Sequence, residues 1–230
     1  MDSSYYLVHK QQLMRDFNQT MKCAIPLLES SYGQNQAEGT VQQTRQVFEA
    51  LLYKLPYIGG DDNPMTGLLI QSAYYLALYR VLKSYGKAVQ EAGKISYQLT
   101  EKTFCDQSHL LVRLSGKLKF NRISMGQIKQ QAERSHRHEY AADWVFDVVE
   151  GNGQAFDYGL NYSECGICKF YHEQGADELT PYVCLLEYPA SQAMGTGMVR
   201  TSTLAEGAAV CDPRYKDGRV VPQAWPPNFA

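Results

Sequence analysis

The stretch that decides the fold runs from Phe156 to Arg214 and contains two segments, NYSECGIC at residues 161–168 and RTSTLAEGAAVCD at residues 200–212. It holds four of the six cysteines and the densest set of chemically reactive side chains in the chain. Its apolar residues change between the period of a strand and the period of a helix. We therefore expect short strands and helices here, supported by everything that precedes them.

Alternating apolar residues indicate the strands. Residues 143–149 and 156–160 alternate on either side of a glycine-rich turn, which predicts two strands joined as a hairpin. The runs 199–203 and 208–211 predict a second hairpin, joined by a turn that contains glycine.

Capping residues and breakers indicate two helices between these hairpins. Ser163 is a good N-cap and predicts a helix that Gly175 ends. Thr180-Pro181 predicts a second helix, which reaches about Ala193 and which Pro189 should kink or shorten. Each of these helices carries cysteine.

Apolar residues at three- and four-residue spacing predict helices through the first 140 residues. The most apolar of them, residues 65–84, should lie at the centre of the helical body. We expect the other helices over residues 5–23, from Pro26 to Gly33, after a cap at Thr40, over 87–100, along Leu110–Leu118, and from a cap at Ser124 to about His136, with loops at 34–39 and 56–64.

Helices followed by antiparallel strands predict an α+β fold. The N-terminal helical body (residues 1–140) should pack on a small antiparallel sheet with two cysteine-bearing helices (residues 141–230). No flexible linker marks the boundary between the two parts. We therefore expect one continuous domain.

Composition excludes several classes of function. The 230 residues carry 22 basic and 24 acidic side chains, so there is no basic excess of the kind that nucleic-acid binding requires. No apolar run approaches the ~20 residues needed to span a bilayer, and the N-terminus does not resemble a signal peptide. We expect a cytoplasmic protein with a small-molecule substrate, without a nucleic-acid or membrane partner; homo-oligomerisation is left open.

The cysteines allow three interpretations. Cys165 follows the predicted cap Ser163 in the first turn of its helix, where the helix dipole favours a thiolate. It could therefore be a nucleophile, with Glu187 or Asp212 moving protons. Alternatively, the cysteines bind zinc, or they are small buried apolar residues. Cys-x2-Cys at residues 165 and 168 is only half of a zinc signature, and the spacing alone leaves all three interpretations open.

Arg200 and Arg214 are the candidate anchors for a substrate carboxylate, because a guanidinium group can bind both oxygens of a carboxylate. The alternative is that both form local ion pairs at the surface. Thr201, Ser202 and Thr203 add hydroxyl groups along the same predicted strand.

At these residues the sequence resembles the L-2-amino-thiazoline-4-carboxylic acid hydrolase family. The resemblance rests on YSEC at residues 162–165, on Cys184, on RTSTLAEG at residues 200–207, and on CDPRY at residues 211–215. It is specific over about residues 143–216 and weaker over the helical body. The usual Cys-Asp-Phe-Arg of the family reads Cys-Asp-Pro-Arg here.

The resemblance implies a hydrolase that opens a small cyclic amidine bearing a carboxylate, by attack on the C=N carbon. We expect no cofactor, with zinc as the alternative. For the founding substrate, an amino-acid derivative, water adds to this carbon and the ring opens to N-carbamoyl-L-cysteine. We assign Cys165 as nucleophile. The full set of candidates comprises Cys165, Cys184, Cys211, Glu187 and Asp212 for catalysis, and Arg200, Arg214, Thr203 and Tyr162 for substrate binding.

Two rival functions are kept. One is a non-catalytic module in which the same cysteines hold zinc and the pocket senses a small molecule. The other is a pathway enzyme of the same fold that cyclises or rearranges an amino-acid derivative, because fold does not fix chemistry.

Overall fold

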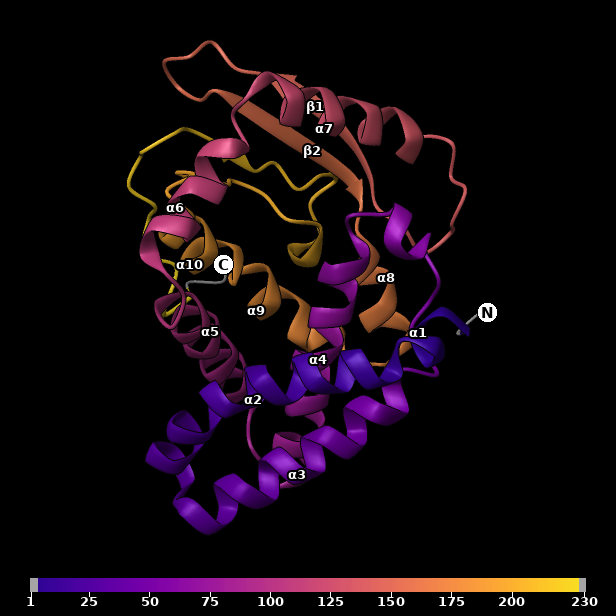
Figure 1. The fold of residues 1–230 in the computed structure, drawn as a ribbon, viewed down its shortest axis with the longest axis vertical. Helices are drawn as coiled ribbons and strands as arrows, with labels where there is room; N and C mark the ends of the chain where they lie inside the picture. The colour runs from indigo at the N-terminus through magenta and orange to yellow at the C-terminus, as the bar shows by residue number, and fades with distance from the viewer. Residues whose placement is uncertain (1–3, 228–230) are drawn as a thin grey trace.

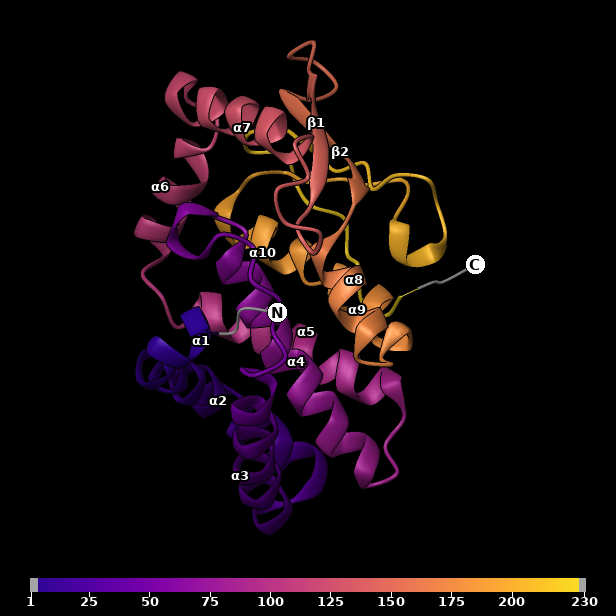
Figure 2. The same cartoon turned by 90° about the vertical axis from the view of Figure 1, so that its right-hand side faces the viewer.

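The computed structural model describes residues 4–227 and has the predicted α+β architecture, with a helical body and a three-stranded antiparallel sheet (Figures 1 and 2). Among the described residues, the α-helices are α1 (Ser4–Val8), α2 (Lys10–Tyr32), α3 (Gln34–Leu51), α4 (Thr66–Ser84), α5 (Val89–Cys105), α6 (His109–Leu118), α7 (Arg122–Ser135), α8 (Gly166–Glu173), α9 (Thr180–Cys184) and α10 (Glu187–Met194). The strands are β1 (Val145–Glu150), β2 (Tyr158–Glu164) and β3 (Arg214–Tyr215), and 3-10 turns form at η1 (Gly60–Asp62), η2 (Asp177–Leu179) and η3 (Leu204–Glu206).

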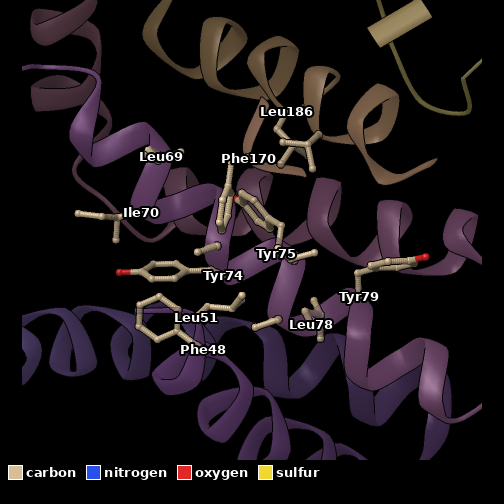
Figure 3. Packing of buried hydrophobic residues seen from close by; sticks show 14 of the residues in the cluster. Phe48, Leu51, Leu69, Ile70, Tyr74, Tyr75, Leu78, Tyr79, Phe170 and Leu186 are labelled. Carbon is tan, nitrogen blue, oxygen red and sulfur yellow. The ribbon is translucent and has the colours of Figure 1, made fainter. Parts of the chain in front are cut away.

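Helix α4 lies at the centre of the molecule, as its apolar sequence predicts. It packs against α3 and α5 and also against α8. On one side Tyr74 meets the ring of Phe48 edge to face, with centroids 4.7 Å apart, and on the other side Tyr75 lies near Phe170 (Figure 3). The hydroxyl of Tyr171 on α8 donates to the carbonyl of Ser72 on α4 at 2.8 Å. The buried core therefore continues from the helical body into the C-terminal segment.

Three sequence predictions for the N-terminal helices are wrong. Pro26 lies inside α2 instead of starting a helix, and residues 34–39 belong to α3 instead of a loop. The predicted cap Thr40 is a buried helical residue whose hydroxyl donates to the carbonyl of Gln36 at 2.7 Å. Burial of one continuous apolar face outweighs the local preferences of proline and polar residues. Gly33, which has a φ of 82°, is the single residue between α2 and α3.

The predicted hairpin of β1 and β2 is confirmed, and α7 packs on β1 (Figure 1). The cap of α7 is Asn121, whose side chain accepts from the amide of Ser124, so the predicted cap is displaced by three residues. The sheet order is β1-β2-β3.

The second predicted hairpin does not form. Residues 199–203 and 208–211 make only isolated bridges, Val199 to Arg214 and Cys211 to Tyr162, and the third strand is β3. Side chains take the hydrogen bonds that a strand ladder would use: the Asp212 carboxylate accepts from the amides of Thr201 and Ser202, both at 2.8 Å.

The helix predicted from residue 180 to about residue 193 is divided into α9 and α10. Pro189 has no N–H to donate to the carbonyl of Leu185, four residues earlier. The helix is accordingly interrupted at Leu185 and Leu186, between the two segments. As a result Cys184 ends one helix and Glu187 begins the next. After Arg219 the described chain forms neither helix nor strand, and Trp225 packs against Tyr97 with ring centroids 5.7 Å apart.

Within residues 4–227, the helices are all too short or too polar to cross a bilayer. The leucines that predict α6 do form a helix, but Leu110, Leu111, Leu114 and Leu118 are exposed.

Candidate active site

A cavity of about 270 Å³ lies between α4, α5, the end of β2 and the two helices α9 and α10. It brings together six of the predicted site residues, one from β2 and five from further positions along the C-terminal segment. They are Tyr162, Cys165, Cys184, Glu187, Arg200 and Cys211. Most of the remaining wall is apolar, with Leu68, Phe104, Trp144, Ile167, Val183, Leu186, Ala190 and Met194 among its side chains.

Cys165 links the end of β2 to the start of α8. The residue has an extended backbone (φ −126°, ψ 120°) and is itself the N-cap, so the helix starts two residues later than a cap at Ser163 would place it. The thiol of Cys168 and the amides of Ile167 and Cys168 interact with the Cys165 sulfur, and they lower the pKa of the Cys165 thiol although burial opposes this.

Cys168 shows the opposite effect. The neighbouring sulfur of Cys165 raises the pKa of the Cys168 thiol, and burial adds to the increase. Within this pair Cys165 is therefore the thiol that loses its proton more readily, and Cys168 is the one that keeps it. Cys168 does not line the cavity, whereas Cys165 does.

The other two cysteines of the cavity remain protonated. Burial raises the pKa of Cys184 well above its ordinary value, although the positive charge of Arg200 acts in the other direction. Burial also raises the pKa of Cys211, whose sulfur accepts from the amide of Leu204 at 3.1 Å. Cys165 is thus the cavity cysteine whose surroundings favour a thiolate.

Arg200 and Glu187 place an ion pair in this apolar wall. The Arg200 guanidinium donates to the Glu187 carboxylate at 2.7 Å and to the carbonyl of Cys184 at 3.0 Å. The Arg200 side chain is only 5% exposed, whereas that of Glu187 is 48% exposed. A buried guanidinium needs such partners, because an unpaired charge is costly to desolvate.

Tyr162 provides a neutral hydroxyl. Its strand β2 pairs with Phe146 of β1 on one side and forms the isolated bridge with Cys211 on the other. Burial raises the pKa of the Tyr162 phenol well above its ordinary value, so the group stays protonated and can donate a hydrogen bond.

Three predicted residues do not line this cavity. The Asp212 carboxylate is held by Thr201 and Ser202; burial disfavours its charge, but the hydrogen bonds lower the pKa overall. The Arg214 guanidinium donates to the carbonyl of Leu160 and to the amide oxygen of Asn161, both at 2.8 Å. Both side chains therefore have partners within the fold.

Thr203 is the third of these residues. It is buried, and its hydroxyl donates to the Glu206 carboxylate at 2.7 Å and accepts from the Glu206 amide at 3.1 Å, which caps η3. Thr203 lines a second cavity of about 310 Å³ between this loop, α9 and the C-terminal stretch at residues 222–227. Arg200 lines both cavities.

Residues of the helical body were missed as part of the site. Gln71, Ser72 and Tyr75 of α4 line the cavity together with Thr100 of α5. The hydroxyls of Tyr75 and Thr100 lie 3.0 Å apart and hydrogen-bond to each other. The sequence did contain a signal for α4. Its helix is apolar nearly all round, and the few polar residues within it need a hydrogen-bond partner or a ligand once they are buried.

Metal binding has no obvious set of ligands. Within the described part of the chain, no three His, Cys, Asp or Glu side chains are grouped so that they could hold an ion. The absence of a cofactor, with zinc as the alternative, stays a prediction.

The fold and the cavity define an α+β protein with a thiol, an ion pair and a phenol around a space for a small molecule. Residues 68–215 match the model of the family described as L-2-amino-thiazoline-4-carboxylic acid hydrolase. Because the match covers more than half of the chain, the protein belongs to this family of hydrolases, and the resemblance seen in the sequence is confirmed. No curated protein and no solved structure is similar enough to the chain to count as a match.

Proposed function

We propose that the protein hydrolyses a small carboxylate-bearing cyclic amidine of the 2-aminothiazoline-4-carboxylate type, with Cys165 as the nucleophile. The observation that carries this proposal is that the Cys165 thiol and the Arg200–Glu187 ion pair line one cavity. The family description names the reaction type, and the side chains around the cavity suit its chemical demands.

Charge complementarity supports the substrate class. A protonated cyclic amidine with a carboxylate is a zwitterion, with one positive and one negative group and no net charge. The cavity offers one guanidinium and one carboxylate in an otherwise largely apolar wall. Arg200 would bind the substrate carboxylate and Glu187 the amidinium, so that each charge that leaves water meets an opposite charge.

The proposed chemistry begins at the amidine carbon. The Cys165 thiolate adds to this carbon, the ring C–S bond breaks, and the ring sulfur leaves as a thiol after taking a proton. Water then adds to the same carbon and displaces Cys165, which gives the N-carbamoyl amino acid. Overall, one water is consumed and nothing is oxidised or reduced.

Two further groups have proposed roles in these steps. Glu187 is partly exposed and could pass a proton between the solvent and the leaving or attacking group. The Tyr162 phenol would donate a hydrogen bond to the substrate. Asp212, Arg214 and Thr203 would support the loop and strand that carry Cys211 and Arg200.

The test is release of thiol from 2-aminothiazoline-4-carboxylate, measured for the wild type, Cys165→Ala and the control Cys105→Ala. Cys105 is an exposed cysteine outside the cavity. Loss of the nucleophile should lower kcat by about 10³-fold or more, whereas the control should keep its activity. Circular dichroism checks that both variants fold. Turnover by Cys165→Ala at the wild-type rate would refute Cys165 as the nucleophile, and no turnover by the wild type would refute the substrate class.

A further inference from the structure

Helix α6 is attached to the molecule by one narrow side. Its buried residues are Val112 and Gly116, and the helix packs on α10. Gly116 faces the backbone carbonyl of Met194 so closely that a side chain would not fit. The inward side of α6 is therefore fixed, and its opposite side lies at the outer edge of the molecule (Figures 1 and 2).

The outward side of α6 is apolar. Leu110, Leu111, Leu114 and Leu118 are between 51% and 76% exposed, and Ile123 at the start of α7 is 75% exposed. At ~100° per residue the four leucines fall within an arc of roughly 100°, on the side of the helix away from Val112 and Gly116. We call the four leucines the leucine face. Soluble proteins seldom leave such a contiguous apolar patch uncovered.

The stretch of chain that carries the leucine face is basic, although Lys129 pairs with Glu150 of β1 at 2.7 Å and Arg113 lies against Gly195. Residues 107–132 contain no Asp or Glu and five basic residues, which are Arg113, Lys117, Lys119, Arg122 and Lys129. The whole chain has a net charge of −2, so this stretch carries +5 and the remainder −7. Such an asymmetry would orient the molecule, with this side toward a negatively charged partner.

We propose that the leucine face and its basic flanks dock on the surface of an anionic lipid bilayer. Leucine side chains can enter the boundary between headgroups and acyl chains, while lysine and arginine stems reach out to the lipid phosphates. The helix would lie on the membrane and would not span it. The expectation that the protein has no membrane partner rested on the absence of a spanning segment, and surface docking does not require one.

A second copy of the chain fits this surface less well. A two-fold contact brings the same patch of both copies together, so the basic flanks of one face would meet those of the other. Lysine is also depleted at protein–protein interfaces, whereas it is favoured beside membranes. The charge of the stretch therefore selects the anionic bilayer.

The experiment is co-sedimentation of the full chain with phosphatidylcholine vesicles that contain phosphatidylglycerol or lack it. The wild type should bind the anionic vesicles, and the double substitution Leu111→Ser/Leu114→Ser should abolish binding. Lys117→Glu should weaken it by roughly fivefold or more, because each basic residue near such a surface contributes about that factor. The matched control is Val8→Ser/Val220→Ser, which changes apolar residues that are 80% and 79% exposed elsewhere and should bind as the wild type does.

Several results would overturn the proposal. They are no binding to anionic vesicles, equal binding to neutral vesicles, or equal loss in the control variant. Light scattering on the same samples measures the molar mass in solution. If the wild type were a dimer that Leu111→Ser/Leu114→Ser dissociates, and no vesicle binding were seen, the leucine face would be assigned to a second copy. Far-ultraviolet circular dichroism of each variant shows whether it folds.

Discussion

Cys165 derives its proposed reactivity from its place at the end of a strand and the beginning of a helix. The amides of Ile167 and Cys168 in the first helical turn help to lower the pKa of its thiol, and Cys168 follows one turn later. The sequence predicted this helix terminus but placed the cap two residues early, at Ser163. The error arose because Ser is the stronger capping residue in isolation, whereas β2 extends through Glu164 and leaves Cys165 as the first residue outside the strand.

We predict that Cys168→Ala raises the pKa of the Cys165 thiol. The Cys168 thiol is the largest contribution that lowers this pKa, so its removal should shift alkylation of Cys165 by iodoacetamide to higher pH. At neutral pH the thiolate fraction falls about tenfold for each unit by which the pKa rises, whereas at strongly alkaline pH the rates of variant and wild type should converge. Mass spectrometry of the Cys165 peptide gives the rate at each pH.

Cys168→Ser should restore part of the effect, because a hydroxyl can also donate a hydrogen bond. Cys105→Ala serves as a control for the loss of a cysteine elsewhere. A pH profile of Cys165 that is unchanged in Cys168→Ala would contradict the role assigned to the pair.

At the scale of elements, α9 can lie against α5 because Gly93 leaves room for it. A Cβ at Gly93 would stand 2.5 Å from the nearest ring carbon of Tyr182. We predict that Gly93→Ala destabilises the fold by about 1–3 kcal/mol, since the overlap forces the two helices apart. Urea denaturation measures the change in the free energy of unfolding.

Gly126→Ala is the matched substitution. Gly126 is exposed inside α7, and a Cβ there would meet nothing within 4 Å. Alanine should therefore stabilise this helix by about 0.5–1 kcal/mol. If Gly93→Ala did not lower the free energy of unfolding relative to Gly126→Ala, close packing of Tyr182 on Gly93 would not limit how near α9 lies to α5.

The elements predicted best are those whose apolar period is long and regular. Helix α4 and the β1–β2 hairpin form where the sequence places them. The run at residues 199–211 was mistaken for a hairpin because β-branched residues were scored by strand propensity alone. The amides of Thr201 and Ser202 bind the Asp212 side chain instead, and the amide of Glu206 binds that of Thr203. An apolar period does not reveal such competition from side chains.

For the whole molecule, one buried cluster joins both parts of the chain. It contains Phe17 and Tyr79 from the helical body and Phe146 and Tyr171 from the C-terminal segment. The sequence predicts Cys165, Cys184 and Cys211 as catalytic candidates, and their convergence requires only that the two cysteine-bearing helices cover the sheet. The polar residues of α4 indicated that this helix has a ligand or a partner, but which cavity α4 and α5 line depends on how the parts pack.

We predict that the chain unfolds in a single cooperative transition, as one continuous domain should. The two tryptophans, Trp144 and Trp225, both lie in the C-terminal segment, whereas most of the long helices lie in the helical body. Tryptophan fluorescence and far-ultraviolet circular dichroism therefore report on different parts of the chain. Urea transitions with the same midpoint by both probes are expected, and two separated midpoints would mean two domains.

Arg200 is a shared wall between the thiol-lined cavity and the space beneath the C-terminal stretch. A short side chain at this position would remove that partition and connect the two spaces into a passage that reaches Cys165 from either end. Arg200→Ala should therefore do more than weaken binding of the substrate carboxylate. Elongated thiol reagents that cannot reach Cys165 in the wild type should react with its sulfur in this variant.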